Sequence, residues 1–394
     1  MRREGRPLSW GAVTPTPFRS FFLGGFECSS HRLRSGRRLD LLRATRHDEF
    51  AAQDYARLRA VGLRAARDGL RWHLIEPRPG EYEWSSVLPM LRAARGTGVQ
   101  VIWDLFHYGW PDDLDLFSPE FPPRFAAFAA AFARVLAAEG EEAPLVTPVN
   151  EISWFAFVGG HAAYLNPFAV GRSRELKRQL VRAATAAMGA IRAALPGARF
   201  VHTEPLIHIV GDPDRPGEHA AARGHHEGQF EALEMLAGRL QPDLGGREDY
   251  LDLIGLNYYP YNQWIHREDG PPTVNLLPGD PLHRPLSTLL AEAHARYDRP
   301  LFLAETGCEG GGRAGWLRHV CDEVRLARGA GVPVGGICLY PVLNHPGWDD
   351  GRHCHNGLWD YADNAGERAV HAPLAAELAR QMRLFAGEVP LAPE

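Results

Sequence analysis

Two glutamates, Glu151 and Glu305, each follow a short apolar run and are flanked by residues that could support acid and base chemistry. Glu151 follows Asn150, and Glu305 precedes Thr306 and Gly307. Two carboxyl groups that flank one bond can cleave a glycoside if one donates a proton to the leaving oxygen while the other is ionised. Their surroundings must then separate their pKa values.

Arg67 and Tyr259 are the side chains expected to keep Glu305 ionised, because a guanidinium group or a hydroxyl donor stabilises a carboxylate. Glu151 would then be the acid. A single glutamate at a strand end also has a purely structural interpretation, as one half of a salt bridge. The combination with Asn150, Arg67 and Tyr259 favours the functional interpretation.

Short apolar runs alternate with amphipathic segments eight times along the chain. The predicted strands are Phe21 to Phe26, Ala65 to Leu70, Val99 to Leu105, Leu145 to Asn150, Arg199 to Thr203, Leu253 to Asn257, Leu301 to Glu305 and Gly335 to Tyr340. The predicted helices are His47 to Ala60, Ser86 to Arg95, Pro123 to Glu139, Arg174 to Leu195, His226 to Leu236, Leu282 to Tyr297, Ala314 to Ala330 and Pro373 to Leu384.

This alternation predicts the α/β class and a parallel sheet, because parallel strands need a crossover connection that a helix can provide. Eight units predict a single closed (β/α)8 TIM barrel. The competing open sheet is disfavoured because no G-x-G-x-x-G turn follows the first strand. In such a barrel the reacting groups lie at the carboxyl ends of the strands, where the polar residues of this sequence gather.

The predicted domain organisation is an N-terminal arm over 1–20, one catalytic barrel over 21–386 and a C-terminal tail over 387–394. No linker divides the chain. The glycine- and proline-rich segments Gly211 to Gly217 and Gly270 to Pro281 are predicted to be loops over the barrel mouth.

Composition narrows the class of partner. The 394 residues are 45% hydrophobic and 23% charged, which is typical of a globular protein. The net charge of −5 is spread along the chain, so neither nucleic acid nor an anionic membrane is an expected partner. No apolar stretch is long enough to span a bilayer. A small uncharged molecule is the expected partner, and five sparse cysteines without a Cys-x-x-Cys pair favour the cytoplasm.

Two short clusters, His353-Cys354-His355 and His225-His226-Glu227, carry side chains that could bind a metal. Neither is accompanied by further ligands at the spacing of a zinc site. The sequence therefore predicts no metal and no cofactor.

Several motifs in order along nearly the whole chain, from Phe22 to Tyr361, resemble glycoside hydrolase family 1, the β-glucosidase family. They are the segment Gly62 to Pro77 with Arg67, Trp72, Glu76 and Pro77, then Phe106-His107-Tyr108, Asn150-Glu151, Gly255-Leu256-Asn257-Tyr258-Tyr259 and Glu305-Thr306-Gly307. The resemblance implies a retaining mechanism with Glu151 as acid/base and Glu305 as nucleophile. It also implies that Asn150 holds the sugar 2-hydroxyl, that His107 holds a neighbouring hydroxyl, and that Asn257 and Tyr259 support the nucleophile.

The sequence departs from the pattern of that family at several positions. Ile152 follows the first glutamate in place of proline, and Thr306 follows the second in place of asparagine. In the eighth strand Tyr340 stands where a tryptophan is usual, and Gly347 replaces the glutamate that grips the 4- and 6-hydroxyls, just before Trp348. In the first strand Glu27 or His31 takes the place of a glutamine.

These departures predict a β-glucosidase-like hydrolase with altered sugar specificity, acting on a small glycoside or an oligosaccharide. Glu27, Tyr340 and Trp348 are expected to contact the sugar, with Trp348 as a stacking platform. Two alternatives stay open. The protein could be a carbohydrate-binding barrel with impaired turnover, or a transglycosidase that uses a sugar acceptor. A third carboxylate, Glu204, is expected to be either a specificity residue or the partner of an arginine.

Overall fold

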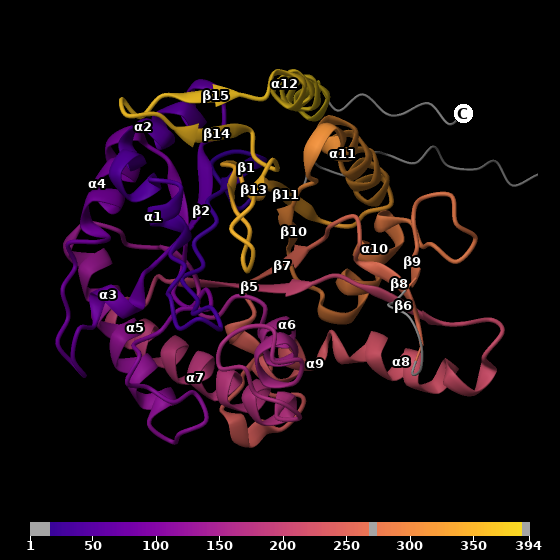
Figure 1. Ribbon diagram of the computed structural model, residues 1–394, viewed down its shortest axis with the longest axis horizontal. Coiled ribbons are helices and arrows are strands. Elements are labelled where there is room, and N and C mark those ends of the chain that lie inside the picture. Colours follow the sequence, from indigo (N-terminus) through magenta and orange to yellow (C-terminus); the bar gives the residue numbers. More distant parts are fainter. Residues whose placement is uncertain (1–15, 268–273, 388–394) are drawn as a thin grey trace, which may run out of the picture.

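The computed structural model describes residues 16–267 and 274–387 of the chain (Figure 1). Eight strands close into one barrel in which every neighbouring pair is parallel. In barrel order they are β1 (Phe22–Gly25), β2 (Ala65–Gly69), β3 (Gln100–Asp104), β4 (Leu145–Thr147), β5 (Arg199–Pro205), β7 (Leu253–Asn257), β10 (Leu301–Thr306) and β11 (Val334–Leu339). The predicted (β/α)8 barrel is confirmed, and each predicted strand is present.

The largest difference in a strand is at β4, which ends at Thr147 although the sequence predicted continuation to Asn150. Pro148 follows and has no N–H to give to the ladder. Asn150 returns to the sheet as an isolated parallel bridge with Thr203. This interruption frees the chain to turn just before Glu151.

The helices lie around the outside of the barrel (Figure 1). Those that match predictions to within a few residues are α2 (His47–Ala60), α4 (Leu88–Thr97), α5 (Phe121–Ala138), α7 (Ser173–Ala194), α10 (Leu286–Tyr297), α11 (Arg313–Gly329) and α12 (Ala372–Gly387). The predicted helix from His226 to Leu236 is instead two helices, α8 (His219–Gly228) and α9 (Glu231–Leu236). They separate at Gln229, whose side chain binds the backbone N–H and C=O of Ile207 at 2.9 and 3.1 Å.

Three helices were not predicted. The first two, α1 (Leu41–Ala44) and α3 (Trp72–Ile75), are single turns, too short to show a period of 3.6 residues. The third, α6 (Ile152–Gly160), has no charged or strongly polar residue apart from Ser153. It therefore lacks the polar face by which an amphipathic helix is found in a sequence.

Small sheets decorate the barrel. A three-stranded sheet of β6 (His208–Gly211), β8 (Gln263–His266) and β9 (Val274–Asn275) lies at one side of it (Figure 1). The two segments predicted as loops over the mouth therefore contain strand residues, and 270–273 lie outside the described residues. After β11 come two antiparallel pairs, β12 (His345–Pro346) with β13 (His353–Cys354), and β14 (Trp359–Ala362) with β15 (Arg368–Val370).

Apolar side chains fill the interior of the barrel. Leu23, Ile102, Val201 and Phe302 are wholly buried members of one cluster. Phe18, which precedes β1, joins it in an edge-to-face contact with Phe302, with the ring centres 4.8 Å apart. The described end of the predicted N-terminal arm is thus part of the core, while 1–15 and 388–394 lie outside the described residues. Among the described helices, none combines the length and apolar character needed to cross a bilayer.

Candidate active site

Glu151 and Glu305 lie at the carboxyl ends of β4 and β10. Asn257, at the end of β7, connects them: its backbone pairs in register with Glu305, and its side-chain Nδ2 donates to Glu151 Oε1 at 2.9 Å. The two carboxyl groups therefore belong to one site on the barrel rim.

Glu305 is held by two donors. Arg67 Nη1 donates to Oε1 at 2.9 Å, and the Tyr259 hydroxyl donates to Oε2 at 2.9 Å. The pKa of Glu305 is raised on balance, because burial outweighs the charge and the hydrogen bond of Arg67, both of which lower it. Arg67 does point at this carboxylate, as the sequence analysis expected.

Among the described residues, no arginine pairs with Glu151. It accepts hydrogen bonds from the Tyr108 hydroxyl and from Asn257, both at 2.9 Å. Burial, with the charge of Glu305 as the second cause, raises the pKa of Glu151 to about 8. Glu151 is therefore the carboxyl group that keeps its proton near neutral pH.

The backbone is strained where these groups meet. Glu151 has a φ of 47° and Tyr108 a φ of 61°, both in the left-handed region that side chains other than glycine seldom adopt. Such conformations cost about 1–3 kcal/mol each and persist where the surroundings impose them. In this backbone conformation the Glu151 side chain points toward Tyr108 and Asn257.

One expected contact is different. Asn257 was expected to support Glu305, but its amide donates to Glu151. The reason is the parallel register: the side chain of Asn257 projects across the rim toward the end of β4, while Tyr259, two residues farther along, reaches Glu305.

Arg67 is wholly buried and ties four strands together. Its Nη1 also donates to the Ala304 carbonyl at 3.0 Å, and its Nη2 donates to Asp104 Oδ2 at 2.6 Å and to Asn150 Oδ1 at 3.0 Å. One cation is thus shared by two buried carboxylates, those of Asp104 and Glu305. Asp104 was not among the predicted site residues.

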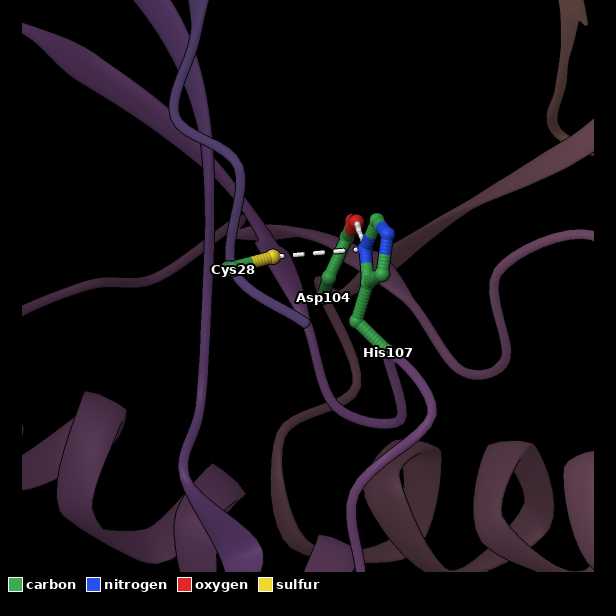
Figure 2. A group of neighbouring side chains, drawn as sticks. All are labelled: Cys28, Asp104 and His107. Atoms are coloured by element: carbon green, nitrogen blue, oxygen red, sulfur yellow. Dashed lines mark hydrogen bonds and ion pairs between the residues drawn. The ribbon is translucent and has the colours of Figure 1, made fainter. Parts of the chain in front are cut away.

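His107 forms a small buried group with Cys28 and Asp104 (Figure 2). Its Nδ1 is 3.0 Å from Asp104 Oδ2 and 3.2 Å from Cys28 Sγ. Asn150 Oδ1 accepts from Arg67 and Thr203, so its Nδ2 must be the group that faces His107 Nε2 at 3.3 Å. Burial lowers the pKa of His107, but Cys28, Asp104 and Glu27 around it raise that pKa well above its usual value, and Nδ1 carries the proton given to Asp104.

Of the two alternatives for the first strand, Glu27 is the residue beside His107. Glu27 is buried, accepts from the Ser29 N–H at 2.9 Å, and has Oε1 at 3.7 Å from His107 Nε2. His31 instead faces the backbone carbonyl of Trp348 at 3.0 Å.

Tyr340 offers a ring and not a hydroxyl group. Its O–H donates to the Phe26 carbonyl at 3.2 Å, and the guanidinium of Arg67 lies 5.2 Å from its ring centre. Any contact of Tyr340 with the sugar would therefore be made by its ring. A Cβ at Gly25 would lie 2.1 Å from the Tyr340 ring, which explains why β1 has glycine there.

Trp348 stands in an aromatic group with Tyr108 and Trp154, at ring-centre distances of 5.7 and 5.5 Å. It is half-buried. At Gly347, a Cβ would lie 2.0 Å from Asp350 Oδ1, the end of an exposed side chain that would have to move.

Glu204 has neither of its two expected roles. It is buried at the end of β5, and its two carboxylate oxygens accept the backbone N–H of Ser153 at 3.1 and 3.2 Å. Ser153 is in the first turn of α6, directly after Glu151, where N–H groups lack helical partners. Burial raises the pKa of Glu204 to about 7. A carboxylate at a helix N-terminus is favoured, so Glu204 fixes the helix that begins at the proposed acid.

Replacing Glu204 with glutamine is expected to lower the pKa of Glu151, because the Glu204 charge contributes to raising it. The alkaline limb of the kcat/KM profile, expected near the Glu151 pKa of about 8, should move to lower pH. Glu81→Gln, in an exposed pair with Arg78, is the control and should leave the profile unchanged. An alkaline limb that stays in place or moves upward in Glu204→Gln would contradict this role.

Tyr108, Asp104 and Thr203 are the site residues that sequence reasoning missed as such. All three lie at or near the end of a predicted strand. That position was the available signal, but without the fold it does not show which neighbours share a contact.

No protein-family profile and no curated protein sequence matches this chain. Solved structures do. The chain is similar to the AHE enzyme from Alicyclobacillus herbarius, with a TM-score of 0.77, 16% identity and coverage of 95% of this chain and 99% of that one. It is also similar to the β-glucosidase from Thermotoga maritima in complex with glucoimidazole, with a TM-score of 0.75, 15% identity and coverage of 96% and 100%. It is similar as well to the β-glycosidase from Pyrococcus horikoshii, with a TM-score of 0.72, 18% identity and coverage of 88% of this chain and 89% of that one.

These similarities establish the class of fold. The chain has the (β/α)8 barrel of the family 1 β-glucosidases, a glycoside hydrolase fold, over nearly its whole length. The resemblance noted in the sequence motifs is confirmed in the fold, and the low identity fits a divergent chain.

Proposed function

We propose that this protein is a retaining glycoside hydrolase that cleaves a β-glycosidic bond. The observation that carries the proposal is the unequal treatment of two carboxyl groups on one barrel rim. Glu305 is paired with Arg67 and Tyr259, and Glu151 is neighboured only by neutral donors. An arrangement of this kind supplies one ionised and one protonated carboxyl group at the same pH.

In the first step, an oxygen of Glu305 attacks the anomeric carbon and forms a bond to it. The bond from that carbon to the leaving oxygen breaks, and the proton of Glu151 goes to the leaving oxygen. In the second step, Glu151 takes a proton from water, the water oxygen bonds to the anomeric carbon, and the bond to Glu305 breaks. We expect the two carboxyl groups to be about 5–5.5 Å apart, as in retaining enzymes.

The inner sugar subsite differs from a glucose site in our proposal. Glu27 Oε1 and His107 Nε2 lie 3.7 Å apart and present polar atoms that suit sugar hydroxyl groups, which can both donate and accept hydrogen bonds. Gly347 supplies no clamp for the 4- and 6-hydroxyls. Trp348, with Tyr108 and Trp154 beside it, offers an aromatic face for the apolar side of a pyranose ring. The substrate is therefore a β-glycoside whose sugar is recognised mainly at the 2- and 3-positions.

The test is the stereochemistry of the first product. A panel of aryl β-glycosides that differ in the sugar is screened with the full chain, and the active member is followed by proton NMR. The first sugar released is expected to be the β-anomer, which then mutarotates. Release of the α-anomer would replace the double displacement with a single one and overturn the proposal.

A second candidate rests on Gly347 and the missing clamp. A barrel that binds sugar without turnover would hold members of the same panel, as calorimetry would detect, and release no aryl alcohol from any of them. That outcome would favour the impaired carbohydrate-binding barrel over the hydrolase.

A further inference from the structure

The described part of the chain contains three groups of side chains whose ligand atoms lie close enough to hold one metal ion. Each combines histidine with acidic or thiol groups. The three groups differ in whether an arginine already neutralises the carboxylate, and this difference decides which of them could attract a metal cation.

The group of Cys28, Asp104 and His107 is a poor metal site (Figure 2). Its carboxylate oxygen, Asp104 Oδ2, already accepts from Arg67 Nη2 at 2.6 Å, and a metal cation there would face that guanidinium. Burial raises the pKa of the Cys28 thiol to about 12, whereas a metal requires the thiolate. This group positions His107.

The group of His226, Glu227 and Glu292 is neutralised in the same way. Arg296 pairs with Glu227 at 2.6 Å, and Arg284 pairs with Glu292 at 2.8 Å. Both carboxylates are therefore already neutralised by an arginine and would attract a metal cation only weakly.

The group of His353, His355 and Asp360 has no arginine on its carboxylate among the ion pairs of the described residues. His353 Nε2 is 2.9 Å from Asp360 Oδ1, and the rings of His353 and His355 are 4.1 Å apart between centres. One ligand atom from each residue lies within 4.8 Å of the others. The two histidines are two residues apart in an extended segment, so both side chains project from the same side.

Asp360 is held in place by the structure behind it. Its Oδ1 accepts from Asn344 Nδ2 at 3.0 Å and from its neighbour's N–H, that of Tyr361, at 2.8 Å. A carboxylate oriented by such hydrogen bonds is the usual support for a metal ligand. Asp360 lies in β14 and His353 lies in β13, so the group joins two separate strands.

From these contacts we propose that His353, His355 and Asp360 form a binding site for a zinc ion. Two imidazole nitrogens and one carboxylate oxygen suit Zn²⁺, which is commonly four-coordinate with water as the remaining ligand, and they do not suit the oxygen-selective Ca²⁺ or Mg²⁺. The adjoining cavity of about 530 Å³ is lined by His353 and Asp360 together with Asp363, Glu367 and Arg368, and it gives a hydrated cation access. The guanidinium of Arg368 is paired with Asp54 and not with the Asp360 carboxylate.

The site would also connect to the barrel mouth. β13 pairs with β12 through His345 and Cys354, and Trp348 lies in the connection between these two strands. A zinc ion bridging β13 and β14 would therefore fasten the segment that carries Trp348. This inference does not depend on the proposed glycosidase activity.

The experiment is calorimetric titration of ZnCl2 into the metal-free full chain near neutral pH. One Zn²⁺ per chain is expected to bind, and His353→Ala and His355→Ala should each weaken binding by at least about tenfold. His161→Ala is the matched control because His161 is an exposed histidine that only stacks on Phe157, and it should bind as the parent does. Zinc should also raise the thermal midpoint of the parent and not that of His355→Ala.

Cobalt distinguishes this site from the buried one. Co²⁺ bound to His353, His355 and Asp360 should show no thiolate-to-metal charge-transfer band, whereas a site containing Cys28 would show one. The proposal is overturned if the parent binds no zinc, if His355→Ala binds as tightly as the parent, or if binding is lost only in Cys28→Ser or His226→Ala. Because His355 is exposed, its alanine variant is expected to fold, which circular dichroism checks.

Discussion

Glu305→Gln is expected to reduce kcat/KM for the best aryl glycoside by about 10⁴-fold or more, since the variant has no group able to form the bond to the anomeric carbon. Glutamine has nearly the same size, and its amide oxygen can still accept from Arg67 Nη1, which bonds Oε1 at 2.9 Å in the parent. The loss should therefore occur without unfolding. Release of the aryl alcohol is the measurement, with circular dichroism and thermal unfolding as checks of structure.

Glu309→Gln is the matched control. Glu309 is an exposed glutamate four residues farther along the same segment, paired with Arg352. Its variant should retain the turnover of the parent. If Glu305→Gln kept more than a small fraction of the parent's turnover, Glu305 would not be the nucleophile, and another carboxylate on the rim would have to be sought.

Arg67→Met is expected to destabilise the folded protein by about 3–5 kcal/mol, because it leaves two buried carboxylates without their cation. Arg67 is wholly buried and bonds to both Asp104 and Glu305. The Arg67 charge lowers the pKa of Asp104 against the effect of burial, which raises it. Urea unfolding at neutral pH, followed by far-ultraviolet circular dichroism, is the measurement.

The loss should depend on pH in a defined direction. Without Arg67, the folded-state pKa values of Asp104 and Glu305 rise, so protonation on acidification favours the folded variant more than the folded parent. The difference in stability between the two proteins should therefore shrink as the pH falls below neutral. Arg78→Met, which removes an exposed pair with Glu81, should leave the unfolding midpoint unchanged. A loss below about 1 kcal/mol for Arg67→Met would mean that Arg67 does not neutralise the two carboxylates.

The prediction of the barrel from the sequence succeeded because its signal is local and repeated. Apolar runs such as Leu253–Asn257 and amphipathic segments such as His47–Ala60 reveal themselves by their period, and their regular alternation leaves few topologies open. Where the period is absent the prediction failed. The helix α6 is apolar on nearly all sides, and the helix split at Gln229 depends on a contact with Ile207 that is distant in sequence.

The candidate site was predictable to the extent that it consists of residue types at strand ends. Glu151, Glu305 and Tyr259 were selected in that way, and Arg67 was selected from inside the second strand as a partner for Glu305. The structure brings them together at one rim. The partner of Asn257 could not be selected, because whether its amide reaches Glu151 or Glu305 depends on the relative height of neighbouring strands. The register of neighbouring strands is set by the packing of the closed barrel, and the residue type at position 257 does not reveal it.

The sequence by itself determined the class of fold, the rim on which polar groups collect, and the pair of carboxyl groups that could act there. Only the tertiary structure decided which of those groups share a proton donor, a cation or a backbone N–H. Glu204 meets the helix after Glu151, and Asn257 meets Glu151, through contacts that span many residues of chain. Hydrogen bonds and charge pairing act over a few ångströms in space, and distance along the chain does not report that separation.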